Sequence, residues 1–155
     1  MTRKLGPGDS VGGYEIVGKL GVGASGAVYR VRRAGAAQQM ALKLMHKEHL
    51  ESETEKRRFV REAEVVKKLA HPNIVPLLDY GDTDDGTPYL VFALLTGQPL
   101  DERLKGGALS NELNGRFAIH VLRALERAHG LEIVHRDIKP ANIFLSRGVM
   151  GDIAQ

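Results

Sequence analysis

The hydrophobic and polar positions of the first half of the chain alternate with a period of two, which is typical of β-strands. Five such stretches occur, and turn-forming residues separate them. Five strands with one helix among them indicate an antiparallel sheet with a single packed helix, and so an α+β fold. The predicted strands cover residues 14–20, 27–32, 39–45, 74–80 and 88–92.

A helix is predicted between the third and fourth strands, from about residue 52 or 54 to Leu69. Glu62 lies beside the apolar face of this helix, where a carboxylate is costly without a partner. Lys43, in the apolar run of the third strand, is the candidate partner, although a lone lysine in such a run is more often an edge residue. The apolar face carries Phe59, Ala63, Val66 and Ala70.

A second long helix is predicted from Ser110, a suitable N-cap, to His129, with Gly130 as the stop signal. Gly115 in its interior should cost roughly 0.5–1 kcal/mol relative to alanine. Its apolar face carries Leu113, Phe117, Val121, Leu125 and Ala128.

The composition is that of a soluble globular protein: 155 residues, 43% of them hydrophobic and 26% charged. The formal charge of +3 comes from interspersed residues of both signs, so no nucleic-acid-binding surface is predicted. The chain has no cysteine, no apolar segment long enough to cross a bilayer and no signal peptide. We therefore expect a cytoplasmic protein without a membrane segment. The sequence does not indicate its oligomeric state.

A glycine turn joins the first two strands through Gly21, Gly23 and Gly26. A dinucleotide-binding turn would open a helix and be followed about 20 residues later by an acidic residue, and neither feature is present. The Walker pattern of P-loop proteins is absent as well. We expect a hairpin whose backbone can lie close to phosphate groups, with Val28 beyond the turn covering a base.

A polar loop over residues 135–142 separates the apolar pair Ile133-Val134 from the apolar run 143–145. The two apolar stretches are predicted to be short buried strands, and Pro140 excludes a continuous helix between them. The loop combines a carboxylate, an ammonium and an amide, which are the groups that phosphoryl transfer to a hydroxyl requires. A plain polar turn would explain any one of them. They are Asp137, Lys139 and Asn142.

The run His-Arg-Asp-Ile-Lys-Pro-Ala-Asn over residues 135–142 resembles the catalytic loop of protein kinases, and a Lys two residues after the Asp is typical of the serine/threonine branch. The glycine turn resembles the kinase glycine-rich loop, and Ala41-Leu42-Lys43 resembles the strand that carries the nucleotide-binding lysine. By these motifs the chain is identified as a member of the eukaryote-like, bacterial type of serine/threonine protein kinases.

The resemblance implies a protein-kinase-like fold in which the five-stranded sheet and its helix form the small lobe. Glycines such as Gly12 and Gly13 among few apolar residues predict a flexible leader over residues 1–13, and on the kinase interpretation residues 14–92 are the small lobe. Residues 93–97 would be the hinge, and residues 98–155 a partial, mainly helical large lobe.

The resemblance also implies ATP and Mg²⁺ as ligands and a protein with a Ser or Thr hydroxyl as the substrate. Asp137 would be the base or orienter of the hydroxyl, Lys139 would contact the transferring phosphate, and Asn142 would bind Mg²⁺. Lys43 would hold the other phosphates, supported by Glu62. The remaining residues expected around the nucleotide are Leu20, Gly21, Gly23, Ser25, Gly26, Val28, Ala41, Phe92 and Leu95.

The sequence departs from the family after the catalytic loop, because neither D-F-G nor A-P-E follows before Gln155. Asp152 is followed by Ile-Ala, so it is not assigned as the metal ligand. Two hypotheses remain. The chain is either an ATP-dependent protein kinase, or it is a truncated kinase-like module that binds a nucleotide or partner without turnover, or a gene fragment without activity. The apolar face of the second helix is expected to lack packing partners.

Overall fold

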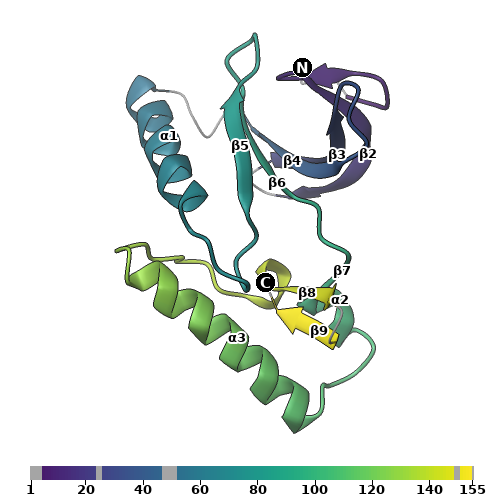
Figure 1. Cartoon of the computed structure of the whole chain (residues 1–155), viewed down its shortest axis with the longest axis vertical. Coiled ribbons are helices and arrows are strands. Elements are labelled where there is room, and N and C mark those ends of the chain that lie inside the picture. The colour runs from purple at the N-terminus through teal and green to yellow at the C-terminus, as the bar shows by residue number, and fades with distance from the viewer. Residues whose placement is uncertain (1–4, 24–25, 47–51, 149–150, 155) are drawn as a thin grey trace. The chain divides into compact units, whose positions relative to one another are not determined.

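The computed structural model describes residues 5–23, 26–46, 52–148 and 151–154 of the chain (Figure 1). The chain divides into two compact units, which are described separately below. Unit 1 comprises residues 1–68 and 76–94, and unit 2 comprises residues 69–75 and 95–155. The division after Leu94 falls inside the predicted hinge, whereas residues 69–75 group with unit 2 and not with the predicted small lobe.

The main element of unit 1 is a six-stranded antiparallel sheet with the strand order β1-β2-β3-β4-β6-β5. The five predicted strands are present, and β1 is an additional short edge strand that the sequence analysis did not predict. The strands are β1 (Ser10–Val11), β2 (Tyr14–Gly23), β3 (Gly26–Arg33), β4 (Gln39–Met45), β5 (Leu77–Asp82) and β6 (Pro88–Ala93).

The prediction of a flexible leader over residues 1–13 is wrong for its last part, because β1 pairs with β2 and the Val11 side chain is buried. Gly12 and Gly13 form the connection, and both have positive φ angles, of 55° and 82°. A two-residue hairpin turn of the favoured type needs positive φ at both positions, which glycine adopts readily. The glycines that suggested a loose segment therefore form a tight turn.

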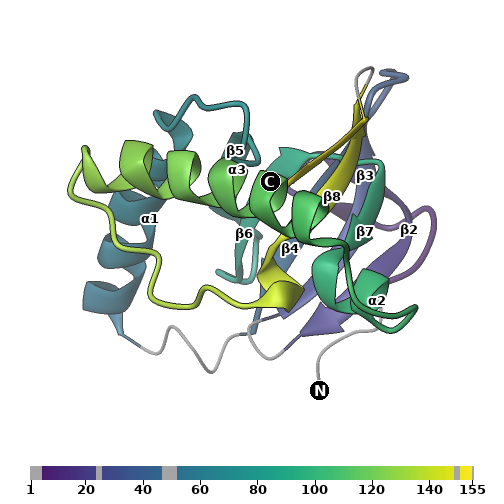
Figure 2. The same ribbon diagram turned by 90° about the horizontal axis from the view of Figure 1, so that it is seen from below.

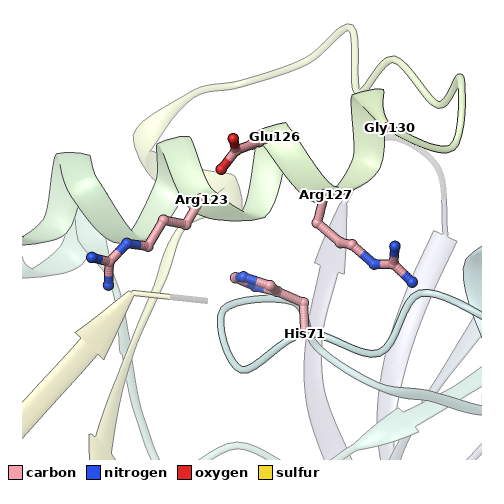
Figure 3. Close-up of a pocket in the computed structure, with 5 residues that line it drawn as sticks. All are labelled: His71, Arg123, Glu126, Arg127 and Gly130. Carbon is pink, nitrogen blue, oxygen red and sulfur yellow. The ribbon is translucent and has the colours of Figure 1, made fainter.

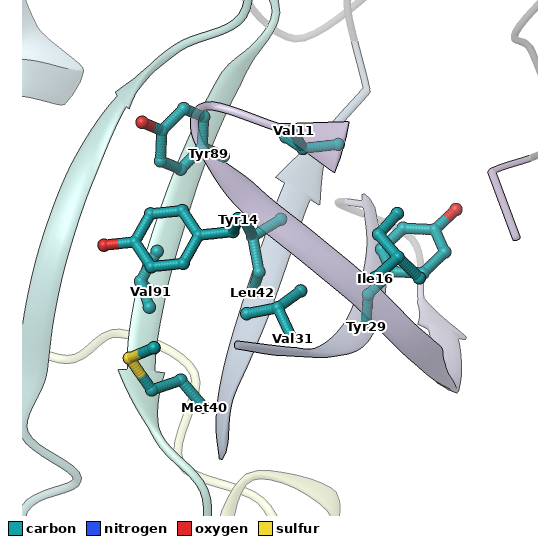
Figure 4. Close-up of a cluster of buried hydrophobic side chains, with 9 residues drawn as sticks. All are labelled: Val11, Tyr14, Ile16, Tyr29, Val31, Met40, Leu42, Tyr89 and Val91. Carbon is teal, nitrogen blue, oxygen red and sulfur yellow. The ribbon is translucent and has the colours of Figure 1, made fainter. Parts of the chain in front are cut away.

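The core of unit 1 is a cluster of nine buried side chains among the described residues (Figure 4). Three of them, Val31, Leu42 and Val91, have no exposed surface. The alternation of β4 explains the arrangement, because Leu42 points into the cluster while its neighbours Ala41 and Lys43 lie on the opposite face. The cluster consists of Val11, Tyr14, Ile16, Tyr29, Val31, Met40, Leu42, Tyr89 and Val91.

A polar network joins strands that are not neighbours in the sheet. The Tyr14 hydroxyl donates a hydrogen bond of 2.6 Å to the Asp79 carboxylate, and Arg33 lies 3.2 Å from the same oxygen. The Arg33 guanidinium also lies 5.3 Å from the centre of the Tyr14 ring. Tyr14 is on β2 and Asp79 on β5, so the network connects two strands that three others separate in the sheet order.

Helix α1 (Glu53–Lys67) lies beside β5 in unit 1 (Figure 1). It begins within one residue of the predicted start and ends two residues before the predicted Leu69. Of the predicted apolar face, Ala63 is buried and Phe59 and Val66 are half-buried, and Leu69, beside that face, is buried as well. Ala70, which follows the helix, is exposed.

Unit 2 contains the second long helix and a small antiparallel sheet with the order β7-β8-β9. The predicted large lobe is therefore less purely helical than expected. Its core among the described residues is small, with only Leu109, Phe117 and Leu145 buried in one cluster. The elements are β7 (Gly97–Pro99), α2 (Leu100–Leu104), α3 (Asn111–His129), the 3₁₀ turn η2 (Pro140–Asn142), β8 (Phe144–Gly148) and β9 (Gly151–Ala154).

Helix α3 has the predicted limits, and its N-cap is confirmed because the Ser110 hydroxyl accepts a hydrogen bond of 3.3 Å from the Leu113 amide. Gly130 is the C-cap, but its φ of −63° is right-handed. The left-handed residue that follows the helix is Glu132, with a φ of 60°. The segment after α3 then runs back along the helix toward β8 (Figure 2).

The predicted buried strand at Ile133-Val134 is wrong. The Ile133 amide donates a hydrogen bond of 3.0 Å to the Ala128 carbonyl, so this backbone group completes the end of α3 and is not free for a sheet. Val134 is 60% exposed. In the run 143–145, the strand begins at Phe144, and Leu145 is the buried residue.

Candidate functional site

The strand register of unit 1 assembles several predicted nucleotide-binding residues in one row. Gly21 of β2 is opposite Val28 of β3, and Val28 is opposite Lys43 of β4. Directly opposed residues of neighbouring strands project on the same face of a sheet. Val28 and Lys43 therefore share one face, and both are half-buried.

A second row lies two residues along β4. Ala41 is opposite Phe92 of β6, and because Ala41 and Lys43 are two residues apart they project on the same face. This face is the one opposite the core side chains Met40 and Leu42. Of the other predicted residues, Leu20 is 44% exposed on β2, and Leu95 is half-buried beyond the end of β6, in the segment assigned to unit 2.

The structure requires a glycine at only one of the three described glycine positions of the turn. A Cβ atom at Gly26 would overlap the Leu44 carbonyl oxygen of the neighbouring strand, so close strand packing requires a glycine there. A Cβ at Gly21 would meet no atom within 4 Å, and Gly23 is almost as open. Space beside the backbone is therefore available at Gly21 and Gly23. Ser25, which was also predicted to contact the nucleotide, lies outside the described residues.

Lys43 is a half-buried ammonium on β4. Burial lowers the pKa of Lys43, because removal from water disfavours the charged form. Among the residues whose side chains the structure describes, no carboxylate lies within ion-pair distance of it. Glu62 is exposed on α1, where its neighbour Ala63 occupies the buried position. The predicted support of Lys43 by Glu62 stays a prediction.

In unit 2 the three predicted catalytic-loop residues come together. The Lys139 ammonium lies 2.8 Å from Oδ2 of Asp137. The Asn142 amide nitrogen donates two hydrogen bonds of 2.9 Å, one to Oδ2 and one to the backbone carbonyl of Asp137. Lys139 is extended and Pro140 begins the 3₁₀ turn η2, so the chain returns Asn142 to Asp137 within a few residues.

This arrangement keeps the Asp137 carboxylate ionised. Its hydrogen bonds with Lys139 and Asn142 hold the pKa of Asp137 below its ordinary value. Both contacts use Oδ2, and the structure places no partner on Oδ1 among the described residues. All three side chains are exposed, so one carboxylate oxygen is open to an incoming hydroxyl or cation.

The sequence analysis gave no role to His135 and Arg136, and the structure shows that they shape the loop. Arg136 has a φ of 65°, an uncommon conformation for a residue with a side chain. The turn lets Nδ1 of His135 accept a hydrogen bond of 3.3 Å from the Asp137 amide. The sequence could have indicated this role, since both residues directly precede Asp137 in the motif.

The loop has too few oxygen atoms to bind a hard divalent cation by itself, so the cation would also need the phosphate oxygens of a bound nucleotide. No group of three His, Cys, Asp or Glu side chains that could hold a metal occurs in the described part of the chain. Asn142 uses its amide nitrogen toward Asp137, which leaves its oxygen as one possible ligand beside Oδ1 of Asp137. Mg²⁺ at a nucleotide site is usually held by one or two carboxylates together with phosphate oxygens, so the Asn142 oxygen could act as a ligand only beside the phosphates of a bound nucleotide. The side chain of Asp152, on β9, lies outside the described residues.

Comparison with known families gives a match over residues 14–152, to the protein kinase domain. Two relatives are each 38% identical over 148 residues. They are the serine/threonine-protein kinase PksC of Streptomyces coelicolor and the DNA damage-responsive serine/threonine-protein kinase RqkA of Deinococcus radiodurans. Among solved structures, the kinase domain of PknI from Mycobacterium tuberculosis superposes with a TM-score of 0.82 at 31% identity.

The matches cover most of this chain but only part of its relatives. The aligned regions span 90% of the chain and 27% of PksC, and 91% of the chain and 21% of RqkA. The PknI superposition covers 97% of this chain and 61% of that one. No helix in the described part of the chain is both long and apolar enough to cross a membrane.

Proposed function

This chain belongs to the protein kinase family, and we propose that it binds ATP and transfers the γ-phosphoryl group to a Ser or Thr hydroxyl of a protein. The observation that carries this proposal is the cluster of Asp137, Lys139 and Asn142, which combines a carboxylate, a cation and an amide within hydrogen-bond distance. These groups are the ones that phosphoryl transfer to a hydroxyl requires.

In the proposed reaction Asp137 accepts a hydrogen bond from the substrate hydroxyl through Oδ1 and receives its proton. The hydroxyl oxygen bonds to the γ-phosphorus of ATP while the bond from that phosphorus to the β,γ-bridging oxygen breaks, and ADP leaves. Its lowered pKa makes it a weak base, so orientation of the hydroxyl is the larger part of its role. Lys139, already beside Asp137, supplies positive charge for the transferring phosphate.

Unit 1 supplies the proposed nucleotide-binding groups. Lys43 is a half-buried cation without a carboxylate partner among the described side chains, and a phosphate group would provide the missing anion. Gly21 and Gly23 have open space beside their backbones, which lets phosphate oxygens approach the amide groups. Val28, Ala41 and Phe92 provide apolar surface on the same face of the sheet.

Mg²⁺ is expected with the nucleotide, where it neutralises charge on the phosphates. The Asn142 amide oxygen would be the protein ligand to it, and Oδ1 of Asp137 stays available to the substrate hydroxyl. In the structure both side chains are fixed by their mutual hydrogen bond, so little ordering of the loop would be needed.

A second candidate function is nucleotide binding without turnover. It is favoured by the arrangement of the loop, in which Lys139 and Asn142 both contact Oδ2 of Asp137. Among the described residues, no group of three His, Cys, Asp or Glu side chains that could hold a metal occurs. Substrate phosphates would have to displace Lys139 from Asp137 for transfer to proceed.

Two variants separate these functions. The purified chain is titrated with ATP and Mg²⁺, nucleotide binding is followed by the thermal shift, and phosphate transfer is measured to a basic acceptor protein. Asp137→Asn should reduce transfer by about 10²- to 10⁴-fold and leave nucleotide binding intact, because it removes only the base and orienter. Lys43→Met should weaken the thermal shift caused by ATP. Asp84→Asn and Lys68→Met, at exposed positions outside both sites, are the matched controls.

Transfer that both variants reduce and both controls retain would establish the kinase activity. An ATP-dependent thermal shift that only Lys43→Met reduces, without any transfer, would establish the binding module. If ATP produces neither transfer nor a shift, both functions are wrong for this chain.

A further inference from the structure

A pocket of about 490 Å³ lies in unit 2, and no residue of the catalytic loop lines it. It is formed between helix α3 and the loop that precedes β5 (Figure 3). Three of its lining residues carry nitrogen donors on their side chains, and one carries a carboxylate. The lining residues are His71, Arg123, Glu126, Arg127 and Gly130.

His71 presents a defined donor to this pocket. Its Nδ1 accepts a hydrogen bond of 3.1 Å from the backbone amide of Asn73. In the neutral imidazole only one ring nitrogen carries hydrogen, so Nε2 is the donor. Figure 3 shows the ring between the side chains of Arg123 and Arg127.

Arg123 and Arg127 are four residues apart on α3 and so lie on one face of the helix. Their guanidinium groups extend on opposite sides of His71 (Figure 3). In the part of the chain that the structure describes, neither guanidinium is within ion-pair distance of a carboxylate, including that of Glu126. Two cations without a carboxylate partner among the described residues, and one neutral donor, thus line the same pocket.

The position of Arg127 in the last turn has an ordinary explanation, because a basic residue there complements the negative end of the helix. That explanation does not extend to Arg123, which lies one turn before Arg127, or to His71 on another segment. Glu126 and the helix end oppose an anion, but two full positive charges outweigh one carboxylate and a partial charge.

We propose that this pocket binds a phosphate monoester, as free phosphate or as a phosphorylated side chain. Phosphate is favoured over a carboxylate because its tetrahedral oxygens accept hydrogen bonds from several directions, and the donors here surround His71 on two sides. Guanidinium groups bind phosphate with paired, charge-assisted hydrogen bonds. The proposal is independent of the proposed catalysis, since none of these residues acts in it.

The test is a titration of the ¹⁵N-labelled chain with inorganic phosphate, with a phosphoserine peptide and with the same peptide unphosphorylated, followed through the side-chain nitrogen resonances of His71 and both arginines. We expect saturable shifts with the two phosphate-bearing probes only. The double variant Arg123→Gln/Arg127→Gln should weaken binding by about tenfold or more. Glutamine keeps the helix propensity, and Arg116→Gln, exposed on the same helix, is the charge-matched control for one arginine.

Tighter binding of the phosphopeptide than of phosphate would identify a phosphorylated side chain as the ligand, and equal binding would identify the free anion. The proposal is overturned if the three resonances do not shift. It is also overturned if Arg116→Gln weakens binding as much as either pocket substitution made singly, because the effect would then be general attraction to a basic helix.

Discussion

Among the described residues, nine buried side chains form the core cluster of unit 1, whereas the cluster of unit 2 contains three. The difference follows from the elements. A curled sheet buries alternate residues of every strand, while α3 presents one apolar face to α2 and the small sheet and leaves other apolar residues exposed. Ile119, Leu122, Val134 and Ile138, all in unit 2, are at least 49% exposed.

The contrast shows how the proposed functional residues of each unit are held. In unit 1, Lys43 and Ala41 stand on a strand whose other face is buried in a packed core, so their positions depend on long-range packing. In unit 2, Asp137, Lys139 and Asn142 are held by hydrogen bonds within six residues of chain. We therefore expect core substitutions to affect the first group far more than the second.

The largest expected effect comes from Leu42→Ala, which removes a side chain with no exposed surface and should lower the free energy of unfolding of unit 1 by about 2–5 kcal/mol. Leu20→Ala, in the same unit at a position 44% exposed, is the matched control and should cost much less. The tyrosine band of the near-ultraviolet circular dichroism spectrum, followed during urea unfolding, reports on unit 1, because all four tyrosines lie there. Equal effects of the two substitutions would contradict the assigned core.

Phe117→Ala should cost about 3 kcal/mol, at the low end for a buried phenylalanine because its cluster is small. Amide hydrogen exchange in α3 should accelerate while the tyrosine signal of unit 1 remains native. Simultaneous loss of both signals would show that the two units unfold as one, against the comparison drawn above.

A smaller effect is expected for Tyr14→Phe, which removes the 2.6 Å hydrogen bond to Asp79 and should cost about 1.5 kcal/mol. Tyr80→Phe is the control, since its hydroxyl is 3.4 Å from the exposed Glu64 and should contribute little. Urea unfolding of both variants measures the two costs.

The cost of Tyr14→Phe should also depend on pH. Burial raises the pKa of Asp79, but hydrogen bonds from Tyr14 and the Tyr80 amide outweigh it, so the net pKa is lowered. A lowered carboxyl pKa stabilises the fold above the ordinary value of about 3.9 and loses this effect as the pH falls through the folded-state value. The difference between wild type and variant should therefore shrink in acid, and a difference that grows would contradict the network.

The smallest expected effect is a gain. Gly115 is exposed in the middle of α3, and a Cβ there would meet no atom within 4 Å. Gly115→Ala should therefore stabilise the helix by about 0.5–1 kcal/mol, visible as slower amide exchange in α3. Faster exchange would show that α3 packs differently from the described arrangement.

The elements and motifs were largely predictable because they depend on periodicity and local chemistry. The strands from Tyr14 onward, Ser110 as N-cap and the Asp137-Lys139-Asn142 loop are examples. The failures concern backbone hydrogen bonds that the sequence does not specify. Gly12-Gly13 suggested flexibility but forms a hairpin turn, and the Ile133 amide bonds to the end of α3 instead of a strand.

The two glycines at the ends of the glycine turn illustrate a further limit of prediction from the sequence. Gly21 and Gly26 look equivalent in the motif, but only Gly26 is forced to be glycine by a neighbouring strand. The predicted Lys43–Glu62 pair shows the same limit. Helical spacing places Glu62 at the edge of the apolar face, where a small rotation of the helix about its axis decides whether the side chain is buried or exposed.

The most direct test of the account is hydrogen–deuterium exchange of the wild-type chain with and without Mg²⁺ and ATP. The account predicts slower exchange in two separate segments, the glycine turn with β4 in unit 1 and the loop 135–142 in unit 2, with the first effect lost in Lys43→Met. Unchanged exchange in both segments at saturating nucleotide would contradict the assignment of these residues to a nucleotide-dependent site.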